Sequence, residues 1–165
     1  MTDKTTYVRI IRNDKLFYLL VIASCFFVSC SNEVIYNKYQ PIQDKVWDKQ
    51  SEFFFSFEMT DNSILYNISI QLRHNNTYPY QNLWLFIEEL QPSNTSVNDT
   101  IEWMFADDSG KWIGNGITLF QNQFLLKKNY HFPDTGKYTV SIRQGMQDER
   151  LKGIENIGLL IEKAK

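Results

Sequence analysis

A strict alternation of apolar and polar residues, from Glu52 onward, constrains the fold of this chain more than any other feature. In the stretch YNISIQLR, residues 66–73, every second side chain is apolar. Successive side chains of a β-strand point to opposite faces of a sheet, so this period predicts strands with one buried face. The same alternation occurs in FFFSFEM, TIEWMF and KYTVSIR, while NLWLFIEE is apolar on both faces, as expected of a central strand.

Turn-forming residues separate these runs, in TDNS, NNTYPY, QPSNTSVND, ADDSG, GNG and PDTG. No long stretch with a period of 3.6 residues competes with them. QFLLKKNYHF and IGLLIEK supply two further strands near the C-terminus. We therefore predict an all-β fold, an antiparallel β-sandwich of the jelly-roll or immunoglobulin-like type, with about 7–9 strands.

An apolar run from Leu16 to Ser29 stands ahead of this β-rich region. Its 14 residues are fewer than the about 20 that a membrane-spanning helix needs. They suit the apolar core of a secretory signal, which is typically about 7–15 residues long. Basic residues dominate the preceding flank, where Lys4, Arg9, Arg12 and Lys15 stand against Asp3 and Asp14. The sequence thus predicts a cleaved signal peptide.

Small residues precede each of two cysteines at the end of this run, a pattern that resembles the lipobox of bacterial lipoproteins. IASC ends at Cys25 and FVSC ends at Cys30. Cleavage before Cys30 leaves a full-length apolar core and the polar SNE after it, whereas cleavage before Cys25 leaves Phe26 and Phe27 on the mature terminus. We favour Cys30 as the lipidation site, with Cys25 as the alternative. The resemblance implies a diacylglyceryl thioether and an acylated amine, and two acyl chains already anchor a protein stably.

The mature chain is the size of one domain. Residues 30–165 are 136 residues, enough to bury a stable core without metals or disulfides. No thiol would remain for a disulfide, because Cys25 leaves with the signal and Cys30 is lipidated. The mature part holds 13 basic and 17 acidic residues, a net charge of −4. This balance, without basic runs, argues against nucleic-acid binding and against electrostatic docking to anionic lipid.

Residues 31–50 are polar and contain Pro41, without a sustained period. Two interpretations stay open: a flexible spacer that lets the domain stand off the membrane, or a first edge strand formed by Val34, Ile35 and Tyr36. We divide the chain into a lipoprotein signal peptide at 1–29, a lipidated terminus and spacer at 30–50, and a single β-sandwich domain at 51–165.

The sequence contains few residues of the types that usually serve in catalysis or metal binding. His74 and His131 are the two histidines, and neither lies near other metal-ligating residues in the sequence. The mature chain would contain no free cysteine, and the sequence has no G-x-S-x-G motif, so we find no candidate nucleophile for covalent catalysis. We interpret Glu88 and Glu89 as charges that end a strand and Asp107–Gly110 as a turn with its glycine in the left-handed region. The sequence therefore predicts no enzyme, no cofactor and no metal.

The aromatic residues are better candidates for a functional role than the histidines and carboxylates, because they could form a binding site. Trp84 and Trp103 lie within apolar strands, so we expect them in the core. Trp112, Tyr78 and Tyr80 lie in or beside loops. Flat apolar rings stack on the faces of pyranose sugars, and exposed rings also anchor protein partners.

Several stretches together are similar to the gliding-motility lipoprotein GldH family of Bacteroidetes. After the lipobox they are WDK, NNTYPYQNLWLFI, NDTIEW, ADDSGKWIGNG, LLKKNYHFPDTGKYTVSIRQGM and LKGIENIGLLIEK, and they extend from about Cys30 to Lys163. The resemblance implies a non-enzymatic, structural or adaptor component of the gliding apparatus and of the associated type IX secretion machinery. It implies other gliding or secretion lipoproteins, or envelope proteins, as partners. One functional position carries over, the lipid-acceptor cysteine.

Two loops are the predicted contact sites for a partner, the alternative being that they pack over the ends of the sandwich. One presents Tyr78 and Tyr80, and the other presents Lys111 and Trp112. A surface-glycan-binding lipoprotein that uses these loops is the alternative function. The sequence DTI also resembles the O-glycosylation sequon of Bacteroidetes, with Thr100 as acceptor.

The residue after the lipidation site bears on localisation. Ser31 follows Cys30, where some bacteria place an aspartate to retain lipoproteins in the inner membrane. We therefore expect a lipid-anchored protein of the outer membrane, with its periplasmic or surface face undecided.

Overall fold

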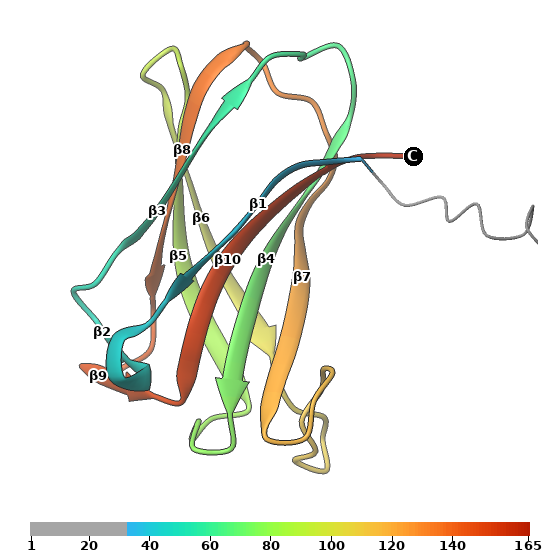
Figure 1. Cartoon of the computed structure of the whole chain (residues 1–165). Helices are drawn as coiled ribbons and strands as arrows, with labels where there is room; N and C mark the ends of the chain where they lie inside the picture. Colours follow the sequence, from blue (N-terminus) through green and yellow to red (C-terminus); the bar gives the residue numbers. More distant parts are fainter. Residues whose placement is uncertain (1–32) are drawn as a thin grey trace, which may run out of the picture. The chain divides into compact units, whose positions relative to one another are not determined.

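The structure is a computed structural model that describes residues 33–165, and these residues form an antiparallel β-sandwich (Figure 1). The predicted signal peptide and both cysteines, Cys25 and Cys30, lie outside the described residues. Within them, the sequence folds into ten strands and one short 3-10 helix. The strands are β1 (Val34–Pro41), β2 (Val46–Asp48), β3 (Phe53–Met59), β4 (Tyr66–Asn75), β5 (Asn82–Leu90), β6 (Ser96–Met104), β7 (Leu119–Tyr130), β8 (Gly136–Gln144), β9 (Arg150–Lys152) and β10 (Ile154–Lys163), and the helix is η1 (Gln43–Lys45).

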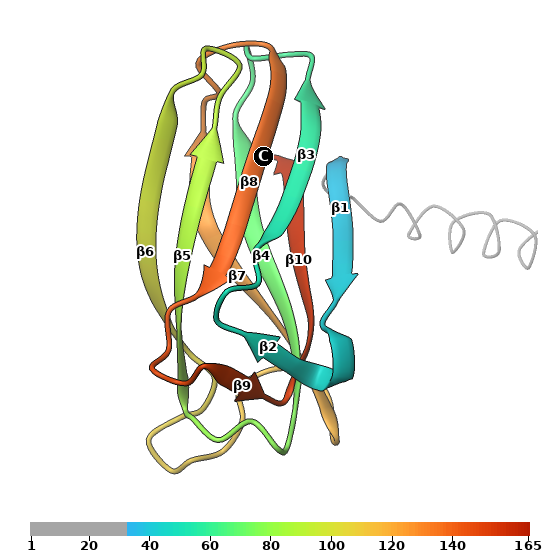
Figure 2. The same cartoon turned by 90° about the vertical axis from the view of Figure 1, so that its left-hand side faces the viewer.

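Two four-stranded sheets form the layers of the sandwich, with strand orders β1-β10-β4-β7 and β3-β8-β5-β6 (Figure 2). All their pairings are antiparallel. Apart from β5 and β6, successive long strands alternate between the two sheets, which is the jelly-roll arrangement rather than the immunoglobulin one. The predicted all-β sandwich is confirmed. The strand number exceeds the expected range because β2 and β9, of three residues each, form a small sheet of their own.

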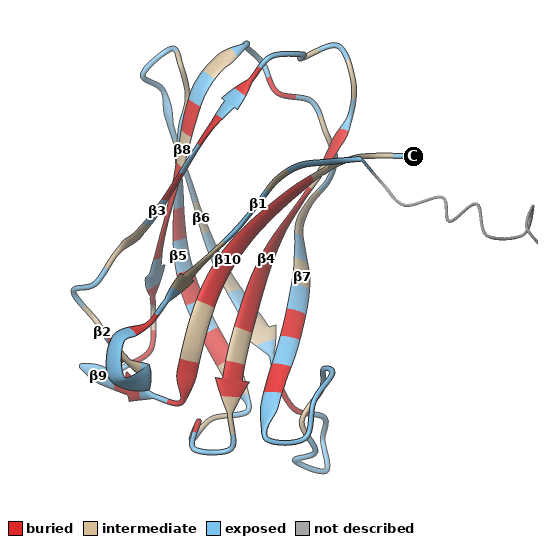
Figure 3. Ribbon diagram, viewed as in Figure 1, coloured by how far each residue is buried: buried red, intermediate tan, exposed pale blue. Residues whose placement is uncertain are grey.

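The predicted alternation places the core correctly. Along β7, buried and exposed residues alternate in the first half of the strand (Figure 3). Aromatic rings from the sheet β3-β8-β5-β6 and from the loop after β7 pack together inside the sandwich: Phe57 stacks on Tyr138 with ring centroids 5.7 Å apart, and Phe132 meets both rings edge-on. Such offset and edge-on pairs add stabilisation beyond the area they bury.

Of the two interpretations left open for residues 31–50, the structure has the edge strand, because residues 34–41 form β1. This strand pairs with β10 from Val34 opposite Glu162 to Pro41 opposite Asn156. Trp47 in β2 has no exposed surface. The β-sandwich therefore begins at residue 34 rather than at residue 51. An edge strand with one half-covered face needs few apolar residues, so its alternation is too weak to see in the sequence.

Glu89 was expected to end a strand with a solvent-exposed charge. It is instead the penultimate residue of β5, and its side chain faces the interior of the sandwich. Its side chain is 6% exposed, and Oε2 lies 2.9 Å from the ammonium of Lys127 on β7. The Tyr130 hydroxyl donates to Oε1 at 3.1 Å. Burial and the Glu89 charge raise the pKa of Tyr130. These contacts join the two sheets by a buried ion pair.

Removing one partner of this pair tests its role. We expect Lys127→Met to lower the free energy of unfolding by about 3 kcal/mol, because it leaves the Glu89 carboxylate buried without a counter-charge. The double variant Glu89→Gln, Lys127→Met should recover most of that loss. Urea unfolding curves measure both.

The exposed neighbour Lys128 provides a matched control, since Lys128→Met removes a cation from the same strand without touching the pair. Equal costs for the two lysine variants would show that the ion pair does not join the sheets.

Candidate functional site

Chemistry-bearing side chains do not gather into a catalytic or metal-binding cluster within residues 33–165. No group of three or more His, Cys, Asp or Glu residues in this range could hold a metal ion. Helices in the same range are all too short or too polar to cross a membrane.

The two loops predicted to contact partners lie at the same end of the sandwich (Figure 1). They close over His74, near the end of β4, which has no exposed surface. The imidazole stacks on Phe105 with centroids 4.7 Å apart and on Phe120 at 5.4 Å. Trp112 and Tyr78 approach it from the sides at 4.8 Å and 5.8 Å. The loops thus form an aromatic cap over the core.

Packing within this cap determines how much of each of the four predicted contact residues is exposed. Tyr78 is 3% exposed, and its hydroxyl donates to the Asn82 carbonyl at 2.6 Å, as expected from the alternative that its loop packs over the end of the sandwich. Trp112 and Tyr80 are half-buried, and the Tyr80 hydroxyl donates to Asp148 Oδ1 at 3.0 Å. Lys111 alone of the four is exposed. The same packing that closes the end of the sandwich removes most of the predicted contact surface.

A tight turn shapes the loop before Trp112, as predicted for Asp107–Gly110. Asp107 Oδ1 accepts hydrogen bonds from the Ser109 amide at 2.9 Å, the Ser109 hydroxyl at 2.6 Å and the Lys111 amide at 3.0 Å. These bonds, above all that of the Ser109 hydroxyl, lower the pKa of the Asp107 carboxyl. Gly110 adopts a φ of +80°, which glycine tolerates without strain.

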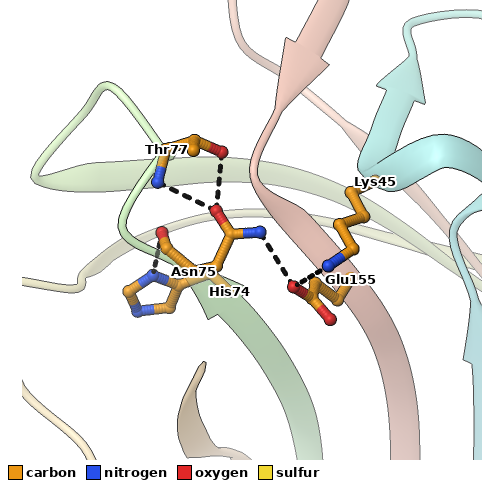
Figure 4. A network of polar contacts seen from close by, with 5 residues as sticks. All are labelled: Lys45, His74, Asn75, Thr77 and Glu155. Atoms are coloured by element: carbon orange, nitrogen blue, oxygen red, sulfur yellow. Dashed lines mark hydrogen bonds and ion pairs between the residues drawn. The ribbon is translucent and has the colours of Figure 1, made fainter. Parts of the chain in front are cut away.

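A polar network fastens the other loop of the cap (Figure 4). Asn75 Oδ1 accepts bonds from the amide and hydroxyl of Thr77, at 2.8 Å and 2.6 Å. Its Nδ2 donates to Glu155 Oε1 at 2.8 Å, and Lys45 Nζ lies 2.8 Å from the same oxygen. The bonds from Lys45 and Asn75 lower the pKa of Glu155. The residues of this network fix the loop to β10 and η1, so their role is structural.

The outer face of the sheet β3-β8-β5-β6 carries the exposed aromatic residues that sequence reasoning missed. Trp84, expected in the core, is 38% exposed, and Phe86 is 41% exposed. Trp103 is half-buried and stacks on Phe124 at 4.4 Å, in agreement with its expected packing. A central strand that is apolar on both faces is usually covered on both, but here nothing within residues 33–165 covers Trp84 and Phe86 fully. The sequence did contain a signal for this exposed face, the apolar run Leu83–Ile87. In a sandwich of only two layers, one face of such a strand must point outward.

A groove lies beside Trp84 at the end of this sheet where β5 begins and β8 ends. Its volume is about 440 Å³, and its lining residues are Tyr80, Asn82, Trp84, Gly145, Met146 and Gln147. Thr100, the predicted acceptor of an O-glycan, is exposed on the same face, opposite Phe86. The exposed face, and not the two loops, therefore carries the candidate surface.

Comparison with known proteins gives the family. The model of the GldH lipoprotein family matches residues 34–161. The gliding motility lipoprotein GldH homolog of Christiangramia forsetii is 31% identical over 155 residues, which cover 89% of this chain and 94% of that protein. The gliding motility lipoprotein GldH of Flavobacterium johnsoniae is 31% identical over 152 residues, which cover 87% and 94%.

The chain belongs to the GldH lipoprotein family. The family match begins at residue 34, the first residue of β1, and ends within β10, so it spans the sandwich as the structure has it. The two relatives are named as gliding motility lipoproteins. A search of solved structures finds the VP2 subviral particle of infectious bursal disease virus, with 17% identity and a TM-score of 0.34, covering 79% of this chain and 30% of that one.

The histidine of the aromatic cap makes stability depend on pH. Burial lowers the pKa of His74, and interactions with the Asn75 carbonyl and the Asn122 amide offset only part of that shift. The unfolded chain therefore binds this proton more readily than the folded one. The stabilisation is complete above the unfolded pKa of about 6.5 and is lost as pH falls through the lower folded pKa.

We expect the free energy of unfolding to fall between pH 7 and pH 5 more steeply in the wild type than in His74→Phe, by up to about 1.4 kcal/mol per pH unit. Urea unfolding at several pH values measures the two slopes. Substitution of the exposed His131 by Gln serves as the control and should leave the wild-type slope. Parallel slopes for the wild type and His74→Phe would contradict the burial of a neutral imidazole.

Proposed function

We propose that this protein is a non-enzymatic structural or adaptor component of the gliding motility machinery and of the associated type IX secretion system. The observation that carries the proposal is the match to gliding motility lipoproteins over the complete sandwich, from β1 to β10. Its partners would then be other gliding or secretion lipoproteins, or envelope proteins.

The placement of the reactive side chains supports a role without catalysis. His74 is enclosed by aromatic rings, and the carboxylate of Glu89 is paired with Lys127 inside the sandwich. A general base must reach a substrate, and neither group is exposed to one. Among the described residues, the buried ionisable groups thus hold the fold together.

The anchor in this proposal is a lipid on Cys30, in the outer membrane. Three residues separate Cys30 from Val34, where the sandwich begins. A fully extended chain covers at most about 3.6 Å per residue, so this link reaches roughly 14 Å. Lipidation at Cys25 instead would lengthen the reach to roughly 32 Å. A Cys30 anchor therefore keeps the domain near the membrane, in contrast to the stand-off expected from a twenty-residue spacer.

Gene replacement in the source bacterium tests the proposal. We expect deletion to reduce colony spreading and the release of type IX cargo at least about tenfold, with the wild-type gene restoring both. Cys30→Ala should fail to restore them, because the protein loses its anchor, while Cys25→Ala should succeed. Intact-mass analysis of the purified protein identifies the acylated residue in each strain.

Normal spreading and normal cargo release in the deletion strain would contradict the proposed role. Full activity of Cys30→Ala, together with acyl mass on Cys25, would keep the role and move the anchor to Cys25.

A further inference from the structure

Two neighbouring aromatic rings stand on the outer face of the sheet β3-β8-β5-β6. Trp84 and Phe86 alternate along β5 with Leu83 and Leu85, which are buried in the core. Scattered apolar residues on a surface are ordinary, but adjacent large rings beside a formed groove are informative. These two rings are held by a central strand, with β6 and β8 hydrogen-bonded on either side.

The missing side chain of Gly145 keeps the groove open. A Cβ atom at this position would lie 3.1 Å from Phe86 Cε2 and 3.2 Å from Trp84 Cβ. The Gly145 amide donates to the Trp84 carbonyl at 2.7 Å, which holds the backbone against the two rings. The groove of about 440 Å³ falls within the range of about 300–1,000 Å³ that is usual for small-molecule sites.

Two of the three polar side chains of the groove are held by hydrogen bonds, and none of the three is charged. The Asn82 amide donates to Glu102 Oε1 at 2.6 Å, and the Tyr80 hydroxyl donates to Asp148 at 3.0 Å. The side-chain amide of Gln147 makes no hydrogen bond within residues 33–165 and is exposed. The lining therefore offers a flat indole, a phenol and two carboxamides.

A second, smaller hollow of about 120 Å³ lies on the other side of Phe86. Arg143 and Glu52 line it, with Thr100 and Asn98 from the edge strand β6. The two hollows flank the pair of aromatic rings on one continuous face. An elongated ligand with repeating units would fill both, whereas a single small molecule would fill one.

We propose that this face, centred on Trp84, binds a neutral oligosaccharide. Pyranose rings present apolar C–H faces that stack on an indole, and their hydroxyls pair with carboxamides and with carboxylates at the rim such as Glu102. A charged ligand would find no counter-charge in the groove itself. The inference goes beyond the proposed function and does not depend on it.

A protein partner or a second copy of the chain fits this face less well. A stable interface buries about 800 Å² on each side around an apolar centre. Here exposed charged residues on the same face adjoin the two rings: Glu102 is opposite Trp84, Arg143 is opposite Phe86, and Glu88 follows on β5. Carboxylates such as those of Glu88 and Glu102 are depleted at protein interfaces, whereas sugar hydroxyls pair with them.

Calorimetric titration of the full-length lipidated protein tests this. The probes are the β-1,4-linked hexasaccharides of glucose, xylose, mannose and N-acetylglucosamine, in a detergent without a sugar headgroup. We expect saturable binding of at least one probe with a Kd below about 1 mM. Trp84→Ala should weaken it at least tenfold, equivalent to about 1.4 kcal/mol, and Trp84→Phe, which retains a flat ring, should weaken it less.

Two further variants separate the site from the fold. Gly145→Ala should also weaken binding, because its Cβ enters the groove. Phe54→Ala removes a 57% exposed ring on β3 of the same sheet, outside the groove, and should leave binding unchanged. Melting temperatures show whether each variant is folded.

Three results would overturn the proposal. One is no saturable binding of any of the four hexasaccharides up to about 10 mM. Another is binding that a folded Trp84→Ala variant retains in full. The third is a change of oligomeric state with Trp84→Ala in sedimentation experiments, without sugar binding, which would assign the face to contacts between copies.

Discussion

The rest of the structure depends on β10, which is hydrogen-bonded to β1 on one side and to β4 on the other. β10 brings Ile157, Leu159 and Ile161 into the core without exposed surface, and it forms the only pairing of β1 within the described residues. The last residues of the chain therefore hold its first strand in place. Lys163 also pairs with Glu33 at 2.7 Å, where β1 begins and β10 ends (Figure 1). Such contacts between distant segments make a jelly roll cooperative but slow to form.

The sandwich uses its ionisable and aromatic side chains for cohesion. His74 and its four aromatic neighbours close one end, and Glu89 with Lys127 joins the sheets elsewhere. Buried charges and imidazoles are costly unless they are paired or enclosed in this way. What remains for binding is the outer face around Trp84, which the fold presents without needing it for the core.

Strands with strong alternation could be predicted from the sequence, because burial on one face imposes a period of two. The apolar faces of β4 and β8 are buried as predicted, from Tyr66 to Leu72 and from Tyr138 to Ile142. The predicted exposure of the opposite faces is wrong at Ser69, Gln71 and Ser141, which are buried as well. β1 was left undecided, because an edge strand buries too little to impose that period. Trp84, Tyr78 and Glu89 were misplaced for one reason. Residue type does not reveal which face of a strand meets the second sheet, or whether a loop folds back over the core.

The central claim is that the folded domain begins at Val34 and that β10 holds this first strand in place. Amide hydrogen exchange of the full-length protein tests this most directly. The account predicts that the β1 amides that donate to β10 exchange at least about 100-fold more slowly than those of an unstructured peptide, in common with their partners on β10. Exchange of these β1 amides at the unstructured rate, with β10 still protected, would contradict it.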